Sequence, residues 1–330
     1  MSVIAKSTLL PQFIQEASLM YRNKSYIANM VAPVLDVKSS RAKITKYNKG
    51  DFFRNEAKVR APGAEPNVIG FKTSSESINT IQYDAAYEIT KEDLQNEGIV
   101  GGAPTTNMKQ DSSFLAVDKL DILVEKAVAD VIRASVWSGV AAGGTDAEGL
   151  WAPVGSTNTF VADITLGKNT ILSNTGMEPN ILVIDYLTWL YLKEVDELNA
   201  KMKTTDDKTL LPQRLASLLE LDYVVVGKAV YSSAVEKQDG TDFTAVKIWD
   251  GPTATKGMGF LAYVAPRPAL KTPSALYRPR THVLDSGNYR AVYEHVVPTS
   301  HKTIIQAVED FQVLACGLDL GYMWKDTIAD

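Results

Sequence analysis

The sequence has one cysteine, three histidines and no long apolar run, and each shortage excludes a class of protein. Cys316 cannot form a disulfide within the chain, which argues for a reducing compartment and against a secreted disulfide scaffold. No apolar run approaches the roughly 20 residues of a membrane-spanning helix, and the start of the chain lacks the apolar core of a secretion signal. We therefore expect a soluble intracellular protein.

Catalytic motifs are also scarce. His282, His295 and His301 show no metal-binding spacing, and no glycine-rich phosphate loop is present. Cys316 lies among apolar residues, which indicates a small buried hydrophobe and not a nucleophile. Asp185 ends the apolar run NILVID, where open α/β sheets often place a ligand-binding carboxylate, but one carboxylate does not make a site. We predict no catalytic residue, no cofactor and no metal.

What is present begins with β-structure in residues 36–90. In 78–90 apolar and polar residues alternate, which predicts a strand with one covered face. That face holds Ile81, Tyr83, Ala85, Tyr87 and Ile89. Residues 48–51 are expected to form a turn, and the Gly-, Pro- and Ser-rich stretch 61–77 an extended loop.

Helical spacing is clearest in residues 113–138, which predict a helix about 39 Å long that acts as a structural spine. Asp111, Ser112 and Ser113 are expected to cap its start, and Gly139 to follow its end.

Strands and helices alternate in residues 180–265. NILVID and DYVVVGKAVY predict buried strands, and residues 186–202 and 211–221 predict helices. The buried side of the first helix is expected to contain Leu187, Leu190, Tyr191, Val195 and Leu198. Residues 275–330 return to β-structure.

Charge is unevenly distributed, although the total of 34 basic and 39 acidic residues gives only 34 − 39 = −5. Residues 38–60 hold eight basic and two acidic residues, net +6, and residues 84–130 hold four and ten, net −6. The two stretches could complement each other within one subunit or between subunits, or they could be two solvated faces. Mild overall acidity argues against a protein that coats nucleic acid over its whole surface.

Several blocks, in their order along the chain, resemble the major capsid proteins of tailed bacteriophages. KGDFFRNEAKVRAPG is the most specific and is similar to the family's extended loop. TGMEPNILVIDYLTWLYLKEVDELNAKMK resembles the axial domain, and VEDFQVLACGLDLGYMWKD resembles the C-terminal return. The resemblance implies an α+β, HK97-like major capsid protein fold. Its parts are an N-terminal arm, an extended β-hairpin loop (the E-loop), a peripheral domain with a long spine helix and an axial α/β domain.

The resemblance also implies a division of the chain. Residues 1–35 would be the arm, 36–90 the extended loop, and 91–175 the peripheral domain with spine helix 113–138. The axial domain would be 176–270, and 271–330 would return to the peripheral domain. No long charged segment precedes the arm, so we expect either a separate scaffold or a chain that is already complete.

By the same resemblance, the chain would assemble into the pentamers and hexamers of an icosahedral phage head enclosing double-stranded DNA. Its expected partners are copies of itself, portal and scaffolding proteins, and packaged DNA without sequence specificity, with no membrane. Its expected location is the virion, assembled in the host bacterial cytoplasm. The residues expected to contact neighbouring subunits are Lys43, Lys46, Lys49, Phe52, Phe53, Arg54 and Arg60. Some family members form Lys–Asn cross-links, but no lysine here can be matched to one.

Two alternatives stay open. One is the shell protein of an encapsulin-like nanocompartment, which has the same fold and encloses a cargo enzyme. The other, from a different class, is an α/β ligand-binding or hydrolytic enzyme that uses Asp185.

Overall fold

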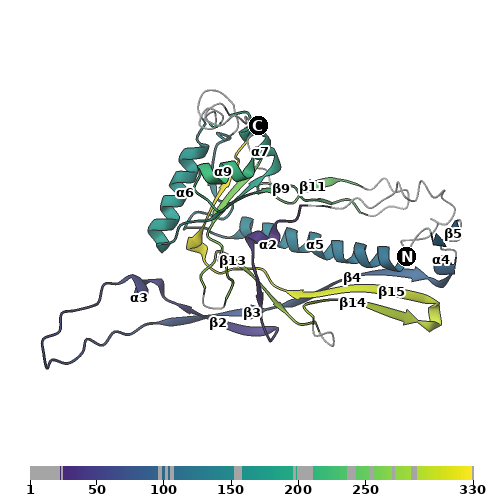
Figure 1. Ribbon diagram of the computed structural model, residues 1–330, viewed down its shortest axis with the longest axis horizontal. Helices are drawn as coiled ribbons and strands as arrows, with labels where there is room; N and C mark the ends of the chain where they lie inside the picture. The colour runs from purple at the N-terminus through teal and green to yellow at the C-terminus, as the bar shows by residue number, and fades with distance from the viewer. Residues whose placement is uncertain are drawn as a thin grey trace.

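The computed structural model of the chain describes residues 23, 25–95, 99–100, 103–104, 108–151, 158–195, 198, 211–235, 243–252, 256–269, 272–283 and 288–328. It is elongated, with a long helix and sheet along its length, an α/β block above them and a thin loop extending from one end (Figure 1). Most of the predicted N-terminal arm lies outside the described residues.

The predicted spine helix is confirmed as α5, Met108–Ala134, and its length of 27 residues corresponds to about 40 Å. Its buried stripe repeats every four residues and contains Ala116, Leu120, Val124, Val128 and Ile132. The predicted cap was wrong, because the helix begins before Asp111. Asp111 lies in the first turn, where its negative charge interacts favourably with the positive end of the helix dipole.

The sheet below α5 has six strands. Its central strand β15 (Lys302–Phe311) pairs antiparallel with β4 (Ile81–Thr90) on one side and with β14 (Arg290–Val297) on the other. At one end β15 also pairs with β13 (Leu276–Thr281), which carries β1 (Val34–Asp36) and β16 (Leu314–Ala315).

The face of β4 that was predicted to be covered is indeed packed, and its partner is α5. Tyr83, Ala85 and Tyr87 contact the cluster formed by Ala116, Leu120 and Ala307. The predicted strand 78–90 is interrupted at Thr80, and Ile81 is exposed because it stands at this break.

The extended loop begins as a two-stranded antiparallel ribbon of β2 (Arg41–Tyr47) and β3 (Thr73–Asn79). Residues 48–72 connect the strands and project away from the body (Figure 1). The turn expected at residues 48–51 is instead the start of a short helix, α3 (Lys49–Phe53). The side-chain oxygen of Asn48 accepts the Gly50 N–H at 3.1 Å and so caps this helix.

The upper block contains a mixed five-stranded sheet in the order β7-β17-β12-β8-β9. The strands are β7 (Thr145–Asp146), β17 (Gly321–Lys325), β12 (Met258–Ala262), β8 (Ile181–Asp185) and β9 (Tyr223–Gly227). β8 and β9 are parallel, as expected of a βαβ unit, whereas β12 is antiparallel to both of its neighbours. The strand β17 comes from the C-terminal segment, so the block draws on distant parts of the chain.

Both faces of this sheet are buried. Ile181 and Val183 face α5, while Leu182 and Ile184 face the helices α6 (Phe160–Thr175), α7 (Tyr186–Leu192) and α9 (Pro212–Leu218). Gly167 of α6 permits close packing, since a Cβ there would lie 2.5 Å from the Trp324 ring.

The prediction for the helix after β8 was correct in part. α7 ends at Leu192, before the predicted end at residue 202, and the residues it buries are Thr188, Trp189 and Leu192. Of the residues predicted to be buried, Val195 and Leu198 are buried and join the same cluster, whereas Leu187 and Tyr191 are half-buried and Leu190 is exposed.

The remaining elements are short. They are α2 (Ala28–Val31), α4 (Lys91–Gln95), β5 (Ile99–Val100), β6 (Ala103–Pro104), β10 (Val230–Ser232), β11 (Ala245–Lys247) and the 3₁₀ turns η2 (Pro298–Ser300) and η3 (Leu318–Leu320).

Candidate assembly surfaces

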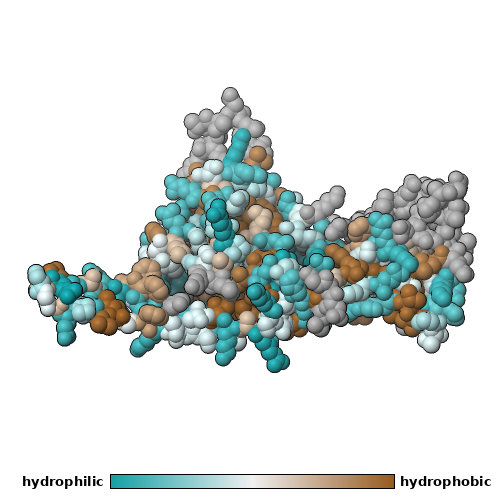
Figure 2. Space-filling view, turned by 60° about the horizontal axis from the view of Figure 1, so that its bottom comes forward, coloured by the Kyte–Doolittle hydropathy of each residue, from teal (hydrophilic) through white to brown (hydrophobic). Residues whose placement is uncertain are grey.

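The projecting loop carries apolar side chains that are largely exposed to solvent in the single chain. Phe52, Phe53, Val59, Val68, Ile69 and Phe71 are all exposed, and Val59 and Val68 are almost fully so. Figure 2 shows apolar surface on this loop, which stands out from the body. Sequence reasoning selected the two phenylalanines of α3 but missed the other four, although apolar residues within a Gly- and Pro-rich stretch are a detectable signal.

Two of the three predicted contact lysines are paired within the chain. Lys46 pairs with Glu76 on the neighbouring strand, and Lys49 Nζ lies 2.6 Å from Asp319 Oδ2 in η3. Lys43 is exposed and makes no ion pair with any described residue. Of the three predicted lysines, Lys46 and Lys49 are therefore engaged within their own subunit, and Lys43 is available to a neighbour.

The two predicted arginines also contact their own loop. The Arg54 guanidinium lies 3.4 Å from Asp51 and 3.7 Å from Glu56, and Arg60 Nε donates to the Ala64 carbonyl at 2.6 Å. These contacts shape the loop locally and leave its apolar side chains facing solvent.

The oppositely charged stretches do not meet within the described chain. The acidic residues of 84–130 find other partners, such as Lys302 for Glu88 and Arg290 for Asp121. No ion pair between described residues joins 38–60 to 84–130. Among the described residues, the two stretches thus do not neutralise each other through ion pairs.

The candidate carboxylate Asp185 has a structural role in the fold. It is fully buried, and its oxygens accept the backbone N–H groups of Leu187, Thr188 and Met258 at 2.9, 3.1 and 3.2 Å. Burial raises the pKa of this carboxyl, while the hydrogen bonds favour the charged form and act in the opposite direction. Asp185 thus caps α7 and ties it to β12.

A second buried carboxylate, Glu125 on α5, was not anticipated. It accepts the N–H groups of Ile27 and Ala28 at 2.9 Å and the indole N–H of Trp249 at 2.5 Å. Burial is the main cause that raises its pKa. The arrangement joins the end of the arm, the spine helix and the upper block.

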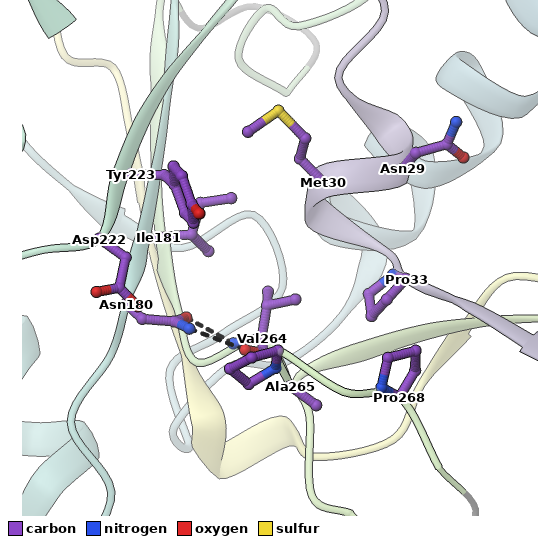
Figure 3. A pocket seen from close by; sticks show the side chains of 11 residues that line it. Asn29, Met30, Pro33, Asn180, Ile181, Asp222, Tyr223, Val264, Ala265 and Pro268 are labelled. Carbon is purple, nitrogen blue, oxygen red and sulfur yellow. Dashed lines mark hydrogen bonds between the residues drawn. The ribbon is translucent and has the colours of Figure 1, made fainter. Parts of the chain in front are cut away.

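An open hollow of about 400 Å³ lies between α2 and the edge of the upper sheet. Its walls are mainly apolar, with Met30 on one side and Tyr223 on the other (Figure 3). Its Asn180 side chain is already engaged, because it donates to the Val264 carbonyl and accepts the Val264 N–H. Asp222 is the one acidic side chain among the described residues that line this hollow.

Among the described residues, no group of three or more His, Cys, Asp or Glu side chains could hold a metal ion. None of the helices in the described ranges has the length and apolar character required to cross a membrane.

Comparisons with known proteins agree on one architecture. No family model matches the sequence. The chain is 23% identical over 253 residues to the major capsid protein of Burkholderia phage BcepMu, covering 75% of this chain and 78% of that protein. A phage-related protein from Bordetella bronchiseptica RB50 superimposes with a TM-score of 0.66 at 19% identity, covering 98% of this chain and 99% of that one. The capsid of cyanophage P-SCSP1u superimposes with a TM-score of 0.59 at 11% identity, covering 93% and 89%.

The chain has the HK97-like fold of phage major capsid proteins. In the terms of that fold, the ribbon with residues 48–72 is the E-loop, α5 is the spine helix, and the five-stranded sheet forms the axial domain. The same fold occurs in the SrpI encapsulin complex of Synechococcus elongatus PCC 7942, with a TM-score of 0.51 at 9% identity, covering 96% and 91%.

Proposed function

We propose that the chain is the major capsid protein of a tailed phage, a structural subunit that assembles with copies of itself into a closed shell. The observation that carries this proposal is the E-loop, which projects from the body with exposed apolar side chains in a chain of capsid fold. A monomer would leave this surface in water, whereas a neighbouring subunit would bury it.

Assembly supplies the stabilisation that the isolated loop lacks. Burying one valine, isoleucine or phenylalanine side chain contributes about 1.5–3 kcal/mol, and several lie on each loop. Head-to-tail contacts of this kind close into rings, and many modest contacts add up over a closed shell. The contact residues in this proposal are Lys43, Lys46, Lys49, Phe52, Phe53, Arg54 and Arg60, with the four apolar residues beyond α3 added to them.

The remaining parts of the proposal follow from the role of a phage shell. The subunit would form pentamers and hexamers, reside in the virion after assembly in the host bacterial cytoplasm, and act with portal and scaffolding proteins. Double-stranded DNA would be enclosed without sequence recognition. The division of the chain at residues 35, 90, 175 and 270 also remains a prediction.

Removing the apolar character of the loop tests the proposal. We expect the combined substitution Val59→Ser, Val68→Ser, Ile69→Ser and Phe71→Ser to abolish large assemblies in sedimentation velocity while the melting temperature stays within a few degrees. A control, Val235→Ser with Phe243→Ser, removes exposed apolar groups from the β10–β11 hairpin. Unchanged assembly of the loop variant would overturn the proposal.

The fold also supports a second candidate, a nanocompartment shell, because the encapsulin superimposes over most of the chain. The two candidates differ in their contents. Particles that carry DNA, and a gene located beside portal and terminase genes, would support the phage head. Particles that copurify with a cargo enzyme would support the compartment.

A further inference from the structure

Among the described residues, the E-loop is attached to the body at two places of different character. The first, at the root of the ribbon, is buried. Ile78 is 1% exposed and packs with Leu35 and Tyr277, and the hydroxyls of Thr80 and Thr281 lie 3.0 Å apart. Such an attachment is expected to hold as long as the domain is folded.

The second attachment, at α3, is exposed. Lys49 and Asp319 form their ion pair at 2.6 Å with both side chains about half exposed, at 47% each. Beside it, the Phe53 ring lies over Gly176 at the C-terminal cap of α6, where an added Cβ would be 3.6 Å from a ring carbon. Phe53 itself is still mostly exposed. This attachment is small and exposed, unlike the root.

The body side of the second attachment is held in place by backbone hydrogen bonds. Asp319 lies in η3, directly before β17. The Ser138 N–H, just beyond the spine helix, donates to the Leu318 carbonyl at 2.9 Å, and the Tyr263 N–H after β12 donates to the Leu320 carbonyl at 2.8 Å. The ion pair therefore links the loop to the point where the spine helix and the axial sheet meet.

We propose that Lys49 and Asp319, with Phe53 against Gly176, form a clasp within one subunit that sets the angle of the E-loop and can open without unfolding. The loop turns about its buried root, and the clasp limits how far it turns. Exposed ion pairs are weak and are screened by salt, so the clasp opens far more easily than the root.

The purpose of the clasp rests on the proposed function. A shell with both pentamers and hexamers presents the loop with neighbours at different angles. A loop held only by its root would search many orientations, and a loop held rigidly would fit one ring size. A weak clasp narrows the search in the free subunit and still lets the loop adapt.

Distances measured in the free subunit test the clasp directly. Two spin labels would be placed by Asn55→Cys, next to α3, and Leu166→Cys, on the exposed side of α6, in a Cys316→Ser background. We expect one narrow distance distribution by pulsed electron paramagnetic resonance at low salt. Lys49→Glu or Asp319→Lys should broaden it, and the combined charge swap should restore it. The matched control is Lys43→Glu, an exposed lysine of the same ribbon, and it should leave the distribution unchanged.

The result that would overturn the clasp is a distribution in which Lys49→Glu and Asp319→Lys match the parent. A second measurement separates contacts within a chain from contacts between chains. A carbodiimide activates the Asp319 carboxylate, and the Lys49 amine displaces the urea to leave an amide bond. In a mixture of ¹⁴N- and ¹⁵N-labelled subunits, cross-linked peptides should carry one isotope only, and mixed-isotope peptides would contradict the proposal. Neither measurement needs a shell, so the clasp can fail while the proposed function stands, and the reverse.

Discussion

At the scale of single residues, the Glu125 carboxylate holds together three segments that are distant in the sequence. It receives N–H groups from the arm and from Trp249 while it stands on the spine helix. These donors favour the charged form of the carboxyl and oppose the effect of burial, which raises its pKa, and no described basic side chain forms an ion pair with it. A buried carboxylate that accepts several N–H groups stabilises the fold, but its loss is costly because the donors stay buried without an acceptor.

We predict that Glu125→Gln lowers the free energy of unfolding by roughly 3 kcal/mol. The amide offers one acceptor where the carboxylate offers two, and each buried N–H left without an acceptor costs about 1–3 kcal/mol. Chemical denaturation measures the loss, and hydrogen exchange should show faster exchange at Ile27 and Ala28. The exposed Glu178→Gln serves as control and should change stability by less than about 0.5 kcal/mol. Equal stability of the two variants would contradict this role.

Cys316 is a partly buried thiol near the root of the ribbon. Burial raises the pKa of its thiol to about 11, and it packs beneath the ribbon root with Ala42 and Ile44. Because the thiolate is the reactive form, alkylation at pH 8 should be about 100-fold slower than at an ordinary thiol. The rate should keep rising with pH through pH 10. An exposed cysteine made by Ser173→Cys, with Cys316→Ser, provides the reference rate. Equal alkylation rates for Cys316 and the reference thiol would show that the ribbon root is accessible to solvent.

At the scale of elements, a charge network joins the spine helix to the sheet below it. Arg290 Nε donates to Glu309 at 2.7 Å and Arg290 Nη1 to Asp121 on α5 at 2.8 Å. Arg278 lies 3.7 Å from Glu309, and both are almost fully buried. Glu309 is therefore the acid on which two arginines depend.

We predict that Glu309→Gln destabilises the chain by about 3–5 kcal/mol, since it leaves buried arginine charge uncompensated. Glu294→Gln is the matched control on the neighbouring strand. Its partner is Lys109 in a half-exposed pair at 2.6 Å, which contributes at most about 1 kcal/mol. Thermal and urea unfolding would measure both, and a loss at Glu309 no larger than at Glu294 would refute the dependence.

Local pattern explains which elements could be predicted from sequence. Residues 81–89 alternate with a period of two, and the residues around Leu120 and Val124 follow a helical period. Each pattern reflects a single partner surface, so a short stretch of sequence is enough to predict the element. The place of β17 beside β12 depends on residues about 60 positions apart, and nothing local encodes it. Likewise, the pairing of Lys49 with Asp319 spans 270 positions, which is why a lysine expected to face a neighbour is engaged in its own subunit.

At the scale of the whole molecule, the −5 net charge conceals a basic loop of +6 and an acidic spine region of −6 that cancel each other, and the rest of the chain carries the −5. No ion pair between described residues joins the two regions within one subunit. Neighbouring subunits could bring them together. We predict that Lys43→Glu with Lys58→Glu slows assembly at low salt without changing the unfolding midpoint, because neither lysine makes an ion pair with a described residue. Light scattering follows assembly and circular dichroism follows folding. Equal losses in both would assign these charges to the fold.

The proposed role requires this chain to build a closed shell through its E-loop. The most direct test is electron microscopy of particles formed by the purified chain, alone and with any scaffolding protein its assembly needs. We expect closed shells of pentamers and hexamers in which each E-loop lies on a neighbouring subunit. A protein that stays monomeric at high concentration under these conditions, or shells in which the loop contacts no neighbour, would contradict it.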